Sequence, residues 1–418
     1  MNHEKWMMEW FEASYRLYLS KQTKQFDPKK FDTDSTDFIN YQNLSQGTSA
    51  PNIAVVKLNG GLGTSMGCSG PKSLIPCTQN GKTFMDLIVE QFNSIPHKGS
   101  SLIFLNSFNT SNQTNQFLTT NYPNLNYSEV MQHEFYRIKA VNDQVDESSF
   151  APPGHGSVYY DLYYSGTLNR CLDEGIDYLF ISNADNLAAT YDARIASYIA
   201  DHNIPFLIEL TSKSDAYVKG GTIIKSDNQF HLWESAQVCD KHLPLFQSQP
   251  YFNTNNIWVH VSSLIELIET QSLHLDLIQN SKTIGDKSYI QLEYAMGSAI
   301  QSFVDAKLLV SPRSRFFPVK KMGDYLLLIS DFCDITDNGQ LVWDQSCTPI
   351  VDCLPPFDRI DNFDAHVKVV PSLKNVSKLT LGGPVYFESH VSISGDLSII
   401  AADNAPLYIY GQSDLPSY

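Results

Sequence analysis

The stretch KLNGGLGTSMGCSGPKS (residues 57–73) holds five glycines in seventeen residues and carries Lys72 next to its end. It follows IAVV (Ile53–Val56), a short run rich in β-branched residues that predicts a buried strand. Glycine lets backbone N–H groups approach phosphate oxygens, and Lys72 adds a positive charge beside them. The stretch therefore predicts a phosphate-binding loop at the end of a strand, with a ligand-free glycine turn as the alternative.

Two common nucleotide-binding motifs do not fit this loop. A dinucleotide-binding fingerprint, G-x-G-x-x-G, would use Gly61 and Gly63 but meets Met66 at its third glycine position. A Walker loop needs glycine directly before its lysine, and Pro71 stands there. The broken fingerprint argues against an NAD-dependent oxidoreductase.

The composition limits the class of protein. The 418 residues are 42% hydrophobic and 18% charged, which is typical of a globular protein with two or three domains. A net charge of −16 argues against a nucleic-acid-binding surface. No apolar run approaches the roughly 20 residues that span a bilayer, and the N-terminus lacks the features of a signal peptide. Seven cysteines without CxxC spacing suit reduced thiols, so we expect a cytoplasmic protein that binds no membrane.

Hydrophobic periodicity divides the chain into three parts. Residues 1–50 contain one amphipathic helix, roughly Glu4–Leu19, followed by a polar strap. Residues 51–330 alternate apolar strands with helical patterns, which predicts an α/β domain around a mostly parallel sheet that binds ligands at the carboxyl ends of its strands. The expected elements include strands at 101–107, 177–183 and 205–211, and a helix capped by Thr83 in which Phe84, Leu87, Ile88 and Phe92 share a face.

Residues 331–418 are expected to form a linker and a repeat. One row of apolar residues recurs every six positions, at Val367, Leu373, Leu379, Val385, Val391 and Leu397. A second row, two positions further on, contains Val369, Leu381, Phe387, Ile393 and Ile399 and is broken by Asn375. A six-residue period is typical of a small parallel β-helix, with an ordinary β-meander as the alternative. Such a stack is a candidate surface for forming a homo-oligomer.

The glycine-rich stretch, LNGGLGTSMG followed by GPKSLI, resembles the signature of the eukaryotic-type UTP–glucose-1-phosphate uridylyltransferases, or UDP-glucose pyrophosphorylases. Further motifs follow in the order of that family: PPGHG (152–156), SGTL (165–168), SNADNLAAT (182–190), VKGGTII (218–224), ESAQV (234–238), FNTNNIWV (252–259), QLEYAMGSAI (291–300) and PRSRFFPVKKMGDYLLL (312–328). The resemblance covers about Val56 to Ser330, with a looser match in the tail. It implies a Rossmann-like, mixed-sheet nucleotidyltransferase domain, similar to the GT-A fold, and a C-terminal left-handed parallel β-helix.

Three places depart from the family pattern. Ser157 follows PPGHG where the family usually has an acidic residue, and Ala188 stands where glycine is commoner. Met322 and Gly323 replace a Thr/Ser pair. We expect these departures to affect the rate or the choice of sugar, not the reaction class.

The resemblance implies a nucleotidyl transfer. A phosphate oxygen of glucose 1-phosphate attacks the α-phosphorus of UTP, giving UDP-glucose and pyrophosphate in a reversible reaction that depends on alignment and charge neutralisation. Lys72 is expected to bind the triphosphate, and Lys320 to neutralise the phosphate under attack. Asp185, just past a predicted strand, is expected to hold Mg²⁺ against the phosphates near Lys72. The alternatives are exposed lysines and a helix-capping aspartate.

The resemblance also implies binding roles for individual residues. Gln132 is expected to hydrogen-bond uracil, and His155 to touch the sugar phosphate. The expected nucleotide-binding residues are Leu58, Asn59, Gly60, Gly61, Lys72, Gln132, Gly154, Asn183 and Lys320. The expected substrate-binding residues are Gly60, Gly61, His155, Asn183, Ala184, Asp185, Gly220, Glu234, Asn253 and Asn255. The asparagines of FNTNN could equally form a turn.

Two other functions stay open at this point. The chain could be a pyrophosphorylase for another UDP-sugar, although relatives of that kind tend to carry arginine where this chain has Ser65. It could also be a non-catalytic protein that binds nucleotide sugars. The presence of Lys72, Asp185 and Lys320 together argues against that second reading.

Overall fold

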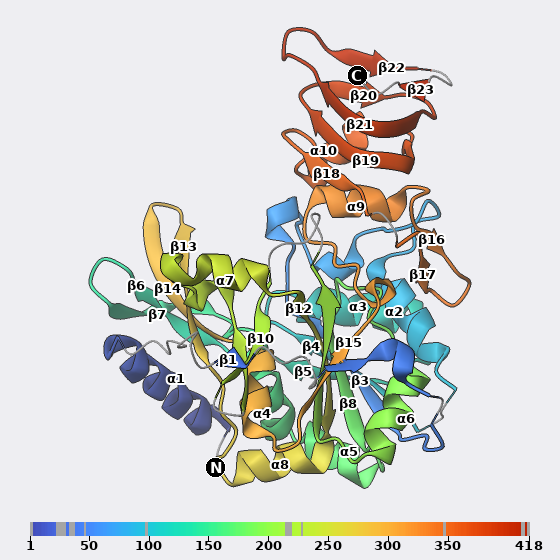
Figure 1. Cartoon of the computed structure of the whole chain (residues 1–418). Coiled ribbons are helices and arrows are strands. Elements are labelled where there is room, and N and C mark those ends of the chain that lie inside the picture. Colours follow the sequence, from blue (N-terminus) through green and yellow to red (C-terminus); the bar gives the residue numbers. More distant parts are fainter. Residues whose placement is uncertain are drawn as a thin grey trace.

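The computed structural model describes residues 3–21, 31–32, 38–45, 47–96, 99–213, 220–226, 229–345, 348–410 and 414–415. Most of the predicted polar strap and Cys347 lie outside these residues. Figure 1 shows helix α1 (His3–Leu19) at one side of a central α/β body, with the C-terminal strands stacked at one end of that body. Within the described residues, no helix is long and apolar enough to cross a membrane.

An eight-stranded sheet forms the centre of the body, with strand order β2-β15-β9-β12-β8-β3-β4-β5. Strand β12 runs antiparallel to both of its neighbours, β8 and β9, and every other neighbouring pair is parallel. The prediction of a mostly parallel, mixed α/β sheet is therefore confirmed. The strands are β2 (Phe38–Asn40), β3 (Ile53–Asn59), β4 (Ser101–Asn106), β5 (Tyr127–Met131), β8 (Tyr178–Asn183), β9 (Phe206–Ser212), β12 (Tyr251–His260) and β15 (Lys307–Val310).

Helices cover both faces of this sheet, which explains why its strands are apolar on both sides. In β3, Ile53 and Val55 belong to one buried cluster and Ala54 and Val56 to another, because successive side chains of a strand point to opposite faces. The first cluster includes α2 (Phe84–Asn93), α6 (Ala193–Asp201) and α9 (Met322–Ile329); the second includes α4 (Val158–Tyr164), α5 (Thr167–Asp173) and α8 (Val261–Glu269). The remaining helices are α3 (Ser111–Asn121), α7 (Leu243–Ser248) and α10 (Ile360–His366).

Thr83 caps the N-terminus of helix α2, as predicted. The Thr83 hydroxyl accepts the backbone N–H of Asp86 at 3.2 Å, and the Asp86 carboxylate accepts the backbone N–H of Thr83 at 2.6 Å. This reciprocal capping box satisfies two N–H groups at the start of the helix. Phe84, Leu87 and Ile88 are buried.

A four-stranded antiparallel sheet flanks the body and carries helix α1. Its strand order is β13-β14-β6-β7, and Tyr294 of β14 stacks on Trp10 of α1 with ring centroids 5.0 Å apart. A smaller sheet has the order β1-β10-β11. The strands of these two sheets are β6 (Phe135–Lys139), β7 (Gln144–Ala151), β13 (Leu277–Ile284), β14 (Lys287–Tyr294), β1 (Phe31–Asp32), β10 (Thr222–Ser226) and β11 (Gln229–Trp233), and the short β16 (Asp334–Ile335) and β17 (Leu341–Val342) form a pair of their own.

The C-terminal strands pair in parallel, which excludes an antiparallel meander for them. Leu379 lies opposite Leu397, Ser372 opposite Ser392 and Val385 opposite Leu407, so the spacing between partners changes from 18 to 20 to 22 residues. The spacing equals three six-residue steps at the Leu379–Leu397 pair and is longer at the other two pairs. The strands are β18 (Ile350–Cys353), β19 (Ser372–Gly382), β20 (Val385–Phe387), β21 (Ser392–Ile400), β22 (Leu407–Ile409) and β23 (Asp414–Leu415).

The break that Asn375 makes in the second apolar row has a structural cause. The register of β19 against β21 shifts between Ser372 and Asn375. Asn375 is exposed as a result, and Val376 is buried in its place. The apolar row thus continues in space while it slips by one position in sequence.

The C-terminal strands share a continuous buried cluster with the body. The rings of Tyr325 in α9 and Phe363 in α10 lie 5.7 Å apart. Gly323 lies against β18 so closely that a Cβ atom there would overlap the carbonyl oxygen of Val351. The unusual glycine at this position is therefore a packing requirement, since it lets α9 approach the strand backbone.

We expect Gly323→Ala to lower the free energy of unfolding by about 1–3 kcal/mol, the usual cost of overpacking a tight contact. The clash is with backbone, which cannot move aside as a flexible side chain would. Urea-induced unfolding of the variant and the parent measures the difference. Ser262→Ala, in the exposed first turn of α8, is the control and should stay within about 0.5 kcal/mol. Equal stability of the Gly323→Ala variant and the parent would contradict the packing argument.

Candidate active site

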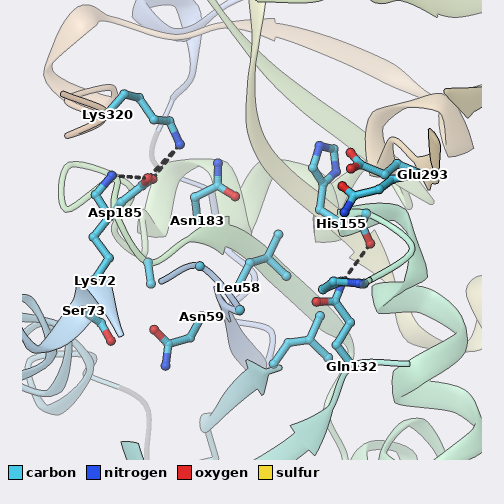
Figure 2. Close-up of a pocket in the computed structure, with 17 residues that line it drawn as sticks. Leu58, Asn59, Lys72, Ser73, Gln132, His155, Asn183, Asp185, Glu293 and Lys320 are labelled. Atoms are coloured by element: carbon cyan, nitrogen blue, oxygen red, sulfur yellow. Dashed lines mark hydrogen bonds and ion pairs between the residues drawn. The ribbon is translucent and has the colours of Figure 1, made fainter. Parts of the chain in front are cut away.

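A cavity of about 320 Å³ lies at the carboxyl ends of strands β3 and β8. Figure 2 shows Lys72, Asp185 and Lys320 on one side of it and Gln132, His155 and Glu293 on the other. The lining residues are Leu58, Asn59, Gly60, Gly61, Lys72, Ser73, Leu105, Gln132, Pro152, Gly154, His155, Asn183, Ala184, Asp185, Gln291, Glu293 and Lys320.

The cavity brings together most of the residues that the sequence nominated. Of the nominated residues, Gly220, Glu234, Asn253 and Asn255 are absent from the described lining. The lining also contains residues that the sequence analysis did not nominate: Ser73, Leu105, Pro152, Gln291 and Glu293. Gln291 and Glu293 stood in the quoted motif QLEYAMGSAI, so the signal was present but carried no role.

Two lysines converge on Asp185. Lys72 Nζ lies 3.1 Å from Asp185 Oδ2, and Lys320 Nζ lies 2.9 Å from Oδ1 and 2.8 Å from Oδ2. Burial works to raise the pKa of the Asp185 carboxyl, but Lys320 and Lys72 outweigh it and hold the pKa below its ordinary value. The carboxylate is therefore ionised at neutral pH. The Lys72 side chain is only 11% exposed while that of Lys320 is 56% exposed, so Lys320 has more freedom to change partners.

The segment that carries Lys320 is tied to the segment that carries Asp185. The backbone N–H of Val319 donates to the carbonyl of Asp185 at 3.0 Å, and Pro318 pairs with Asn186 in an antiparallel bridge. Lys72 also donates to the carbonyl of Val319. The glycine-rich loop, the end of β8 and residues 318–320 thus meet at one point.

A buried ion pair between Arg315 and Glu209 holds the chain segment that leads to Lys320. Arg315 Nε lies 2.6 Å from Glu209 Oε2, and Arg315 Nη2 lies 2.7 Å from Glu209 Oε1. The guanidinium therefore binds both oxygens of the carboxylate. Trp258 donates to the same carboxylate at 2.9 Å, and Ser311 at 2.8 Å. Sequence reasoning missed this pair because 106 residues separate its two members.

His155 occupies a turn that requires glycine on both sides. Gly154 has a φ of +78°, and a Cβ atom at Gly154 or Gly156 would lie within 2.8 Å of the backbone of Tyr294 in β14. His155 Nδ1 accepts the backbone N–H of Met296 at 3.0 Å. Burial, together with the charge of Lys320, lowers the pKa of His155 to about 4. The neutral ring therefore carries its proton on Nε2, the nitrogen that is left to donate to a ligand.

Gln132 marks the opposite end of the cavity. Its side-chain amide donates to the carbonyl of Gly154 at 2.8 Å and to the hydroxyl of Ser157 at 3.1 Å. A Cβ atom at Gly60 would lie 3.0 Å from Gln132 Oε1, so glycine leaves room for that oxygen. Ser157, which departs from the family pattern, holds this amide in place.

Four nominated residues do not line the cavity: Gly220 lies before β10, Glu234 after β11, and Asn253 and Asn255 in β12. Asn255 has a φ of +61° at an irregularity in β12, and it exchanges hydrogen bonds of 2.8 and 2.9 Å with Asn253. These asparagines therefore form an irregularity within strand β12, and not the turn that the sequence left open for them. Gly221, beside Gly220, leaves the space that the Glu234 carboxylate occupies, and burial raises the pKa of Glu234.

The residues present suit a divalent cation only in combination with a ligand. The described residues contain no group of three or more His, Cys, Asp or Glu side chains that could hold a metal. Asp185 is a single ionised carboxylate on the cavity wall. Mg²⁺ is commonly bound by one or two carboxylates together with substrate phosphates, and Asp185 fits that arrangement.

An open α/β sheet whose strand ends meet a cavity lined by two lysines and a glycine loop is an arrangement that suits phosphate-bearing ligands such as nucleotides. Residues 8–394 match the family described as UTP--glucose-1-phosphate uridylyltransferase. The chain is 35% identical to the enzyme of that name from Solanum tuberosum, over 94% of this chain and 88% of the relative. It is also 35% identical to the enzyme of that name from Saccharomyces cerevisiae, over 94% and 84%. The chain belongs to the UTP–glucose-1-phosphate uridylyltransferase family.

Solved structures agree with this placement. The UDP-glucose phosphorylase of Trypanosoma brucei superimposes with a TM-score of 0.85 at 34% identity, covering 97% of this chain and 93% of that one. A UDP-glucose pyrophosphorylase variant from Leishmania major, crystallised with UDP-glucose, gives a TM-score of 0.85 at 31% identity, covering 95% and 93%.

We expect His155→Asn to reduce the fall in the free energy of unfolding that occurs between pH 6.5 and pH 4. Because the pKa of His155 is about 4 in the folded protein against an ordinary 6.5, the unfolded chain binds a proton that the folded protein excludes between these values. Stability contributed by the neutral ring is therefore present above pH 6.5 and falls as the pH drops toward 4. Denaturant unfolding at several pH values measures it. Parallel stability curves for the variant and the parent would show that His155 is not held neutral.

Proposed function

We propose that this chain makes UDP-glucose and pyrophosphate from UTP and glucose 1-phosphate, reversibly, by in-line attack of the sugar phosphate on the α-phosphorus. The observation that carries the proposal is the convergence of Lys72 and Lys320 on Asp185 in a cavity whose far end presents Gln132 and glycine backbone. One end suits polyphosphate and the other suits a planar base with polar edges.

The far end of the cavity would bind uracil. Gln132 offers Oε1 beside Gly60, and this oxygen can accept the ring N–H of uracil, because the amide N–H groups already donate to Gly154 and Ser157. Leu58, Asn59, Gly61 and Gly154 also line the cavity, so the base would contact backbone that carries no bulky side chain at its glycines. Asn183 lies between the two ends and would contact the nucleotide and the sugar.

The two lysines supply the charge that the reaction needs. Two polyanions must meet, and preorganised cations offset their repulsion at the moment of attack. Lys72 and Lys320 are held by Asp185, and phosphate oxygens would replace one or both of these contacts when UTP enters. His155 would donate from Nε2 to a phosphate oxygen. Mg²⁺, held by Asp185 and the phosphates near Lys72, would neutralise phosphate charge when bound.

The hexose would lie toward Gly220, Glu234, Asn253 and Asn255, with Ala184 and Asp185 at its phosphate. Glucose carries several hydroxyls, and neutral or carboxylate oxygens and amides are suitable partners for them. Asn253 and Asn255 form two hydrogen bonds with each other, and each side chain keeps further donors or acceptors for a ligand.

We also propose three domains: a helical and strap segment (1–50), the nucleotidyltransferase domain (51–330) and a linker with a left-handed parallel β-helix (331–418). The parallel pairing of β18, β19, β21 and β23 supports the β-helix. Exposed Tyr408 and Tyr410 at its end support a homo-oligomer contact. The free thiols of the six described cysteines support a cytoplasmic location.

The test of the reaction is pyrophosphate release from UTP and Mg²⁺ with a panel of sugar 1-phosphates. We expect the highest kcat/KM with glucose 1-phosphate, because Ser65 replaces the arginine expected in relatives that use N-acetylated sugars. Higher kcat/KM with N-acetylglucosamine 1-phosphate would indicate another UDP-sugar enzyme. Absence of release with every sugar phosphate would indicate a binding protein.

Lys320→Ala should lower kcat by about 10²–10³ with a much smaller effect on KM for UTP, since the preorganised charge acts mainly in the transition state. Lys72→Ala should also raise KM for UTP, because the triphosphate is already charged in the ground state. Steady-state kinetics on both variants, with folding checked by circular dichroism, separates the two roles.

Lys321→Ala is the matched control for Lys320→Ala. Lys321 is adjacent in sequence, but its ammonium pairs with Asp352 at 2.9 Å on the exposed side. Its removal should leave kcat and KM unchanged within about twofold, since an exposed ion pair contributes little. A Lys320→Ala enzyme with normal kcat would contradict the proposed role of Lys320 in the transition state.

A further inference from the structure

Among the described residues, two carboxylates line the cavity: Asp185, which pairs with Lys72 and Lys320, and Glu293. Glu293 lies in β14 and lines the wall opposite Lys72 and Lys320, next to His155 (Figure 2). Glu293 Cβ is so close to Gly154 that a Cβ atom there would lie 2.9 Å from it. A carboxylate would repel phosphate, so its partner in a bound nucleotide must be a hydrogen-bond donor.

One oxygen of the Glu293 carboxyl is already held. Asn280 donates to Oε1 at 3.3 Å. The amide of Gln291, in the orientation that satisfies both of its ends, donates to Oε1 of Glu293 at 3.2 Å and accepts from Arg137 Nη2 at 3.1 Å and Nε at 2.8 Å. The second oxygen, Oε2, accepts no hydrogen bond from any described residue. The side chain is thus oriented by one oxygen and leaves the other for a ligand.

The position of Glu293 selects among the donors that a uridine nucleotide offers. Gln132 donates to the carbonyl of Gly154 at 2.8 Å, so Gly154 stands between Gln132 and Glu293 on the cavity wall. If the uracil ring N–H pairs with Gln132, the donors that the nucleotide has left are the two vicinal hydroxyls of its ribose. The ribose is joined directly to the base, so it would lie on the same side of the cavity as Gln132 and Glu293.

We propose that the Glu293 carboxylate accepts hydrogen bonds from the ribose hydroxyls of the bound nucleotide and makes the site selective for ribonucleotides over deoxyribonucleotides. This inference rests on the proposed function and names a binding residue within the same site. Burial raises the pKa of the Glu293 carboxyl in the free protein, and the hydrogen bond from Asn280 and the charge of Lys282 only partly offset that effect. Ribose hydroxyls would add donors to this carboxylate.

The experiment compares UTP with 2′,3′-dideoxy-UTP as co-substrates of glucose 1-phosphate. The parent chain should prefer UTP by about tenfold to hundredfold in kcat/KM, the usual effect of a hydrogen bond to a charged group. In Glu293→Ala, kcat/KM for UTP should fall by that factor while kcat/KM for the dideoxy nucleotide stays the same. Glu293→Gln, which keeps the shape, should show the same direction with a smaller change.

A matched control is Glu266→Ala, which removes an exposed carboxylate from α8 and should change neither value. An equal fall for both nucleotides in Glu293→Ala and Glu293→Gln would overturn the proposal, because a merely structural role cannot distinguish the hydroxyls. Calorimetric binding of the two nucleotides to the same variants keeps the test independent of turnover. If the parent binds UTP in preference to the dideoxy nucleotide but makes no UDP-glucose, the proposed reaction fails while the ribose contact stands.

Discussion

The contact of Asp185 with Lys72 and Lys320 is the constraint around which the site is organised. Two ammonium groups so close together would repel each other in a cavity partly shielded from water. The carboxylate between them offsets that repulsion, and it does so while joining segments that lie 113 and 135 residues away from it in sequence. Both cations are therefore held near the place where phosphate would bind. Little rearrangement is needed before they act, which is the condition for effective electrostatic stabilisation.

This junction depends on buried polar structure beneath it. The Arg315–Glu209 pair takes two charges out of water, and such a pair contributes less to stability than its geometry suggests. Its value here is positional, because it fixes the chain immediately before Lys320 against β9. Trp258 of β12, the reversed strand between β8 and β9, completes the contact.

The departures from the family pattern are better explained by contacts in this chain than by chemistry. Ser157 holds the amide of Gln132, and Gly323 makes room for the backbone of Val351. Ala188 is buried, with 5% of its surface exposed, in the cluster beneath the site.

Local patterns in the sequence were sufficient for the strands, the capped helix at Thr83 and the mostly parallel sheet, because these depend on side-chain periodicity and on the fixed direction of parallel strands. Most of the residues that gather at the strand ends were nominated by the resemblance to the family. Long-range contacts were beyond the reach of local patterns. Packing alone brings Arg315 to Glu209 and Glu293 to Gly154. The pairing of β19 with β21 likewise decides that Val376 is buried where the apolar row would place Asn375. Burial and charge in the folded chain set the state of Asp185 and His155, since the same side chains in an extended chain would be hydrated and unpaired.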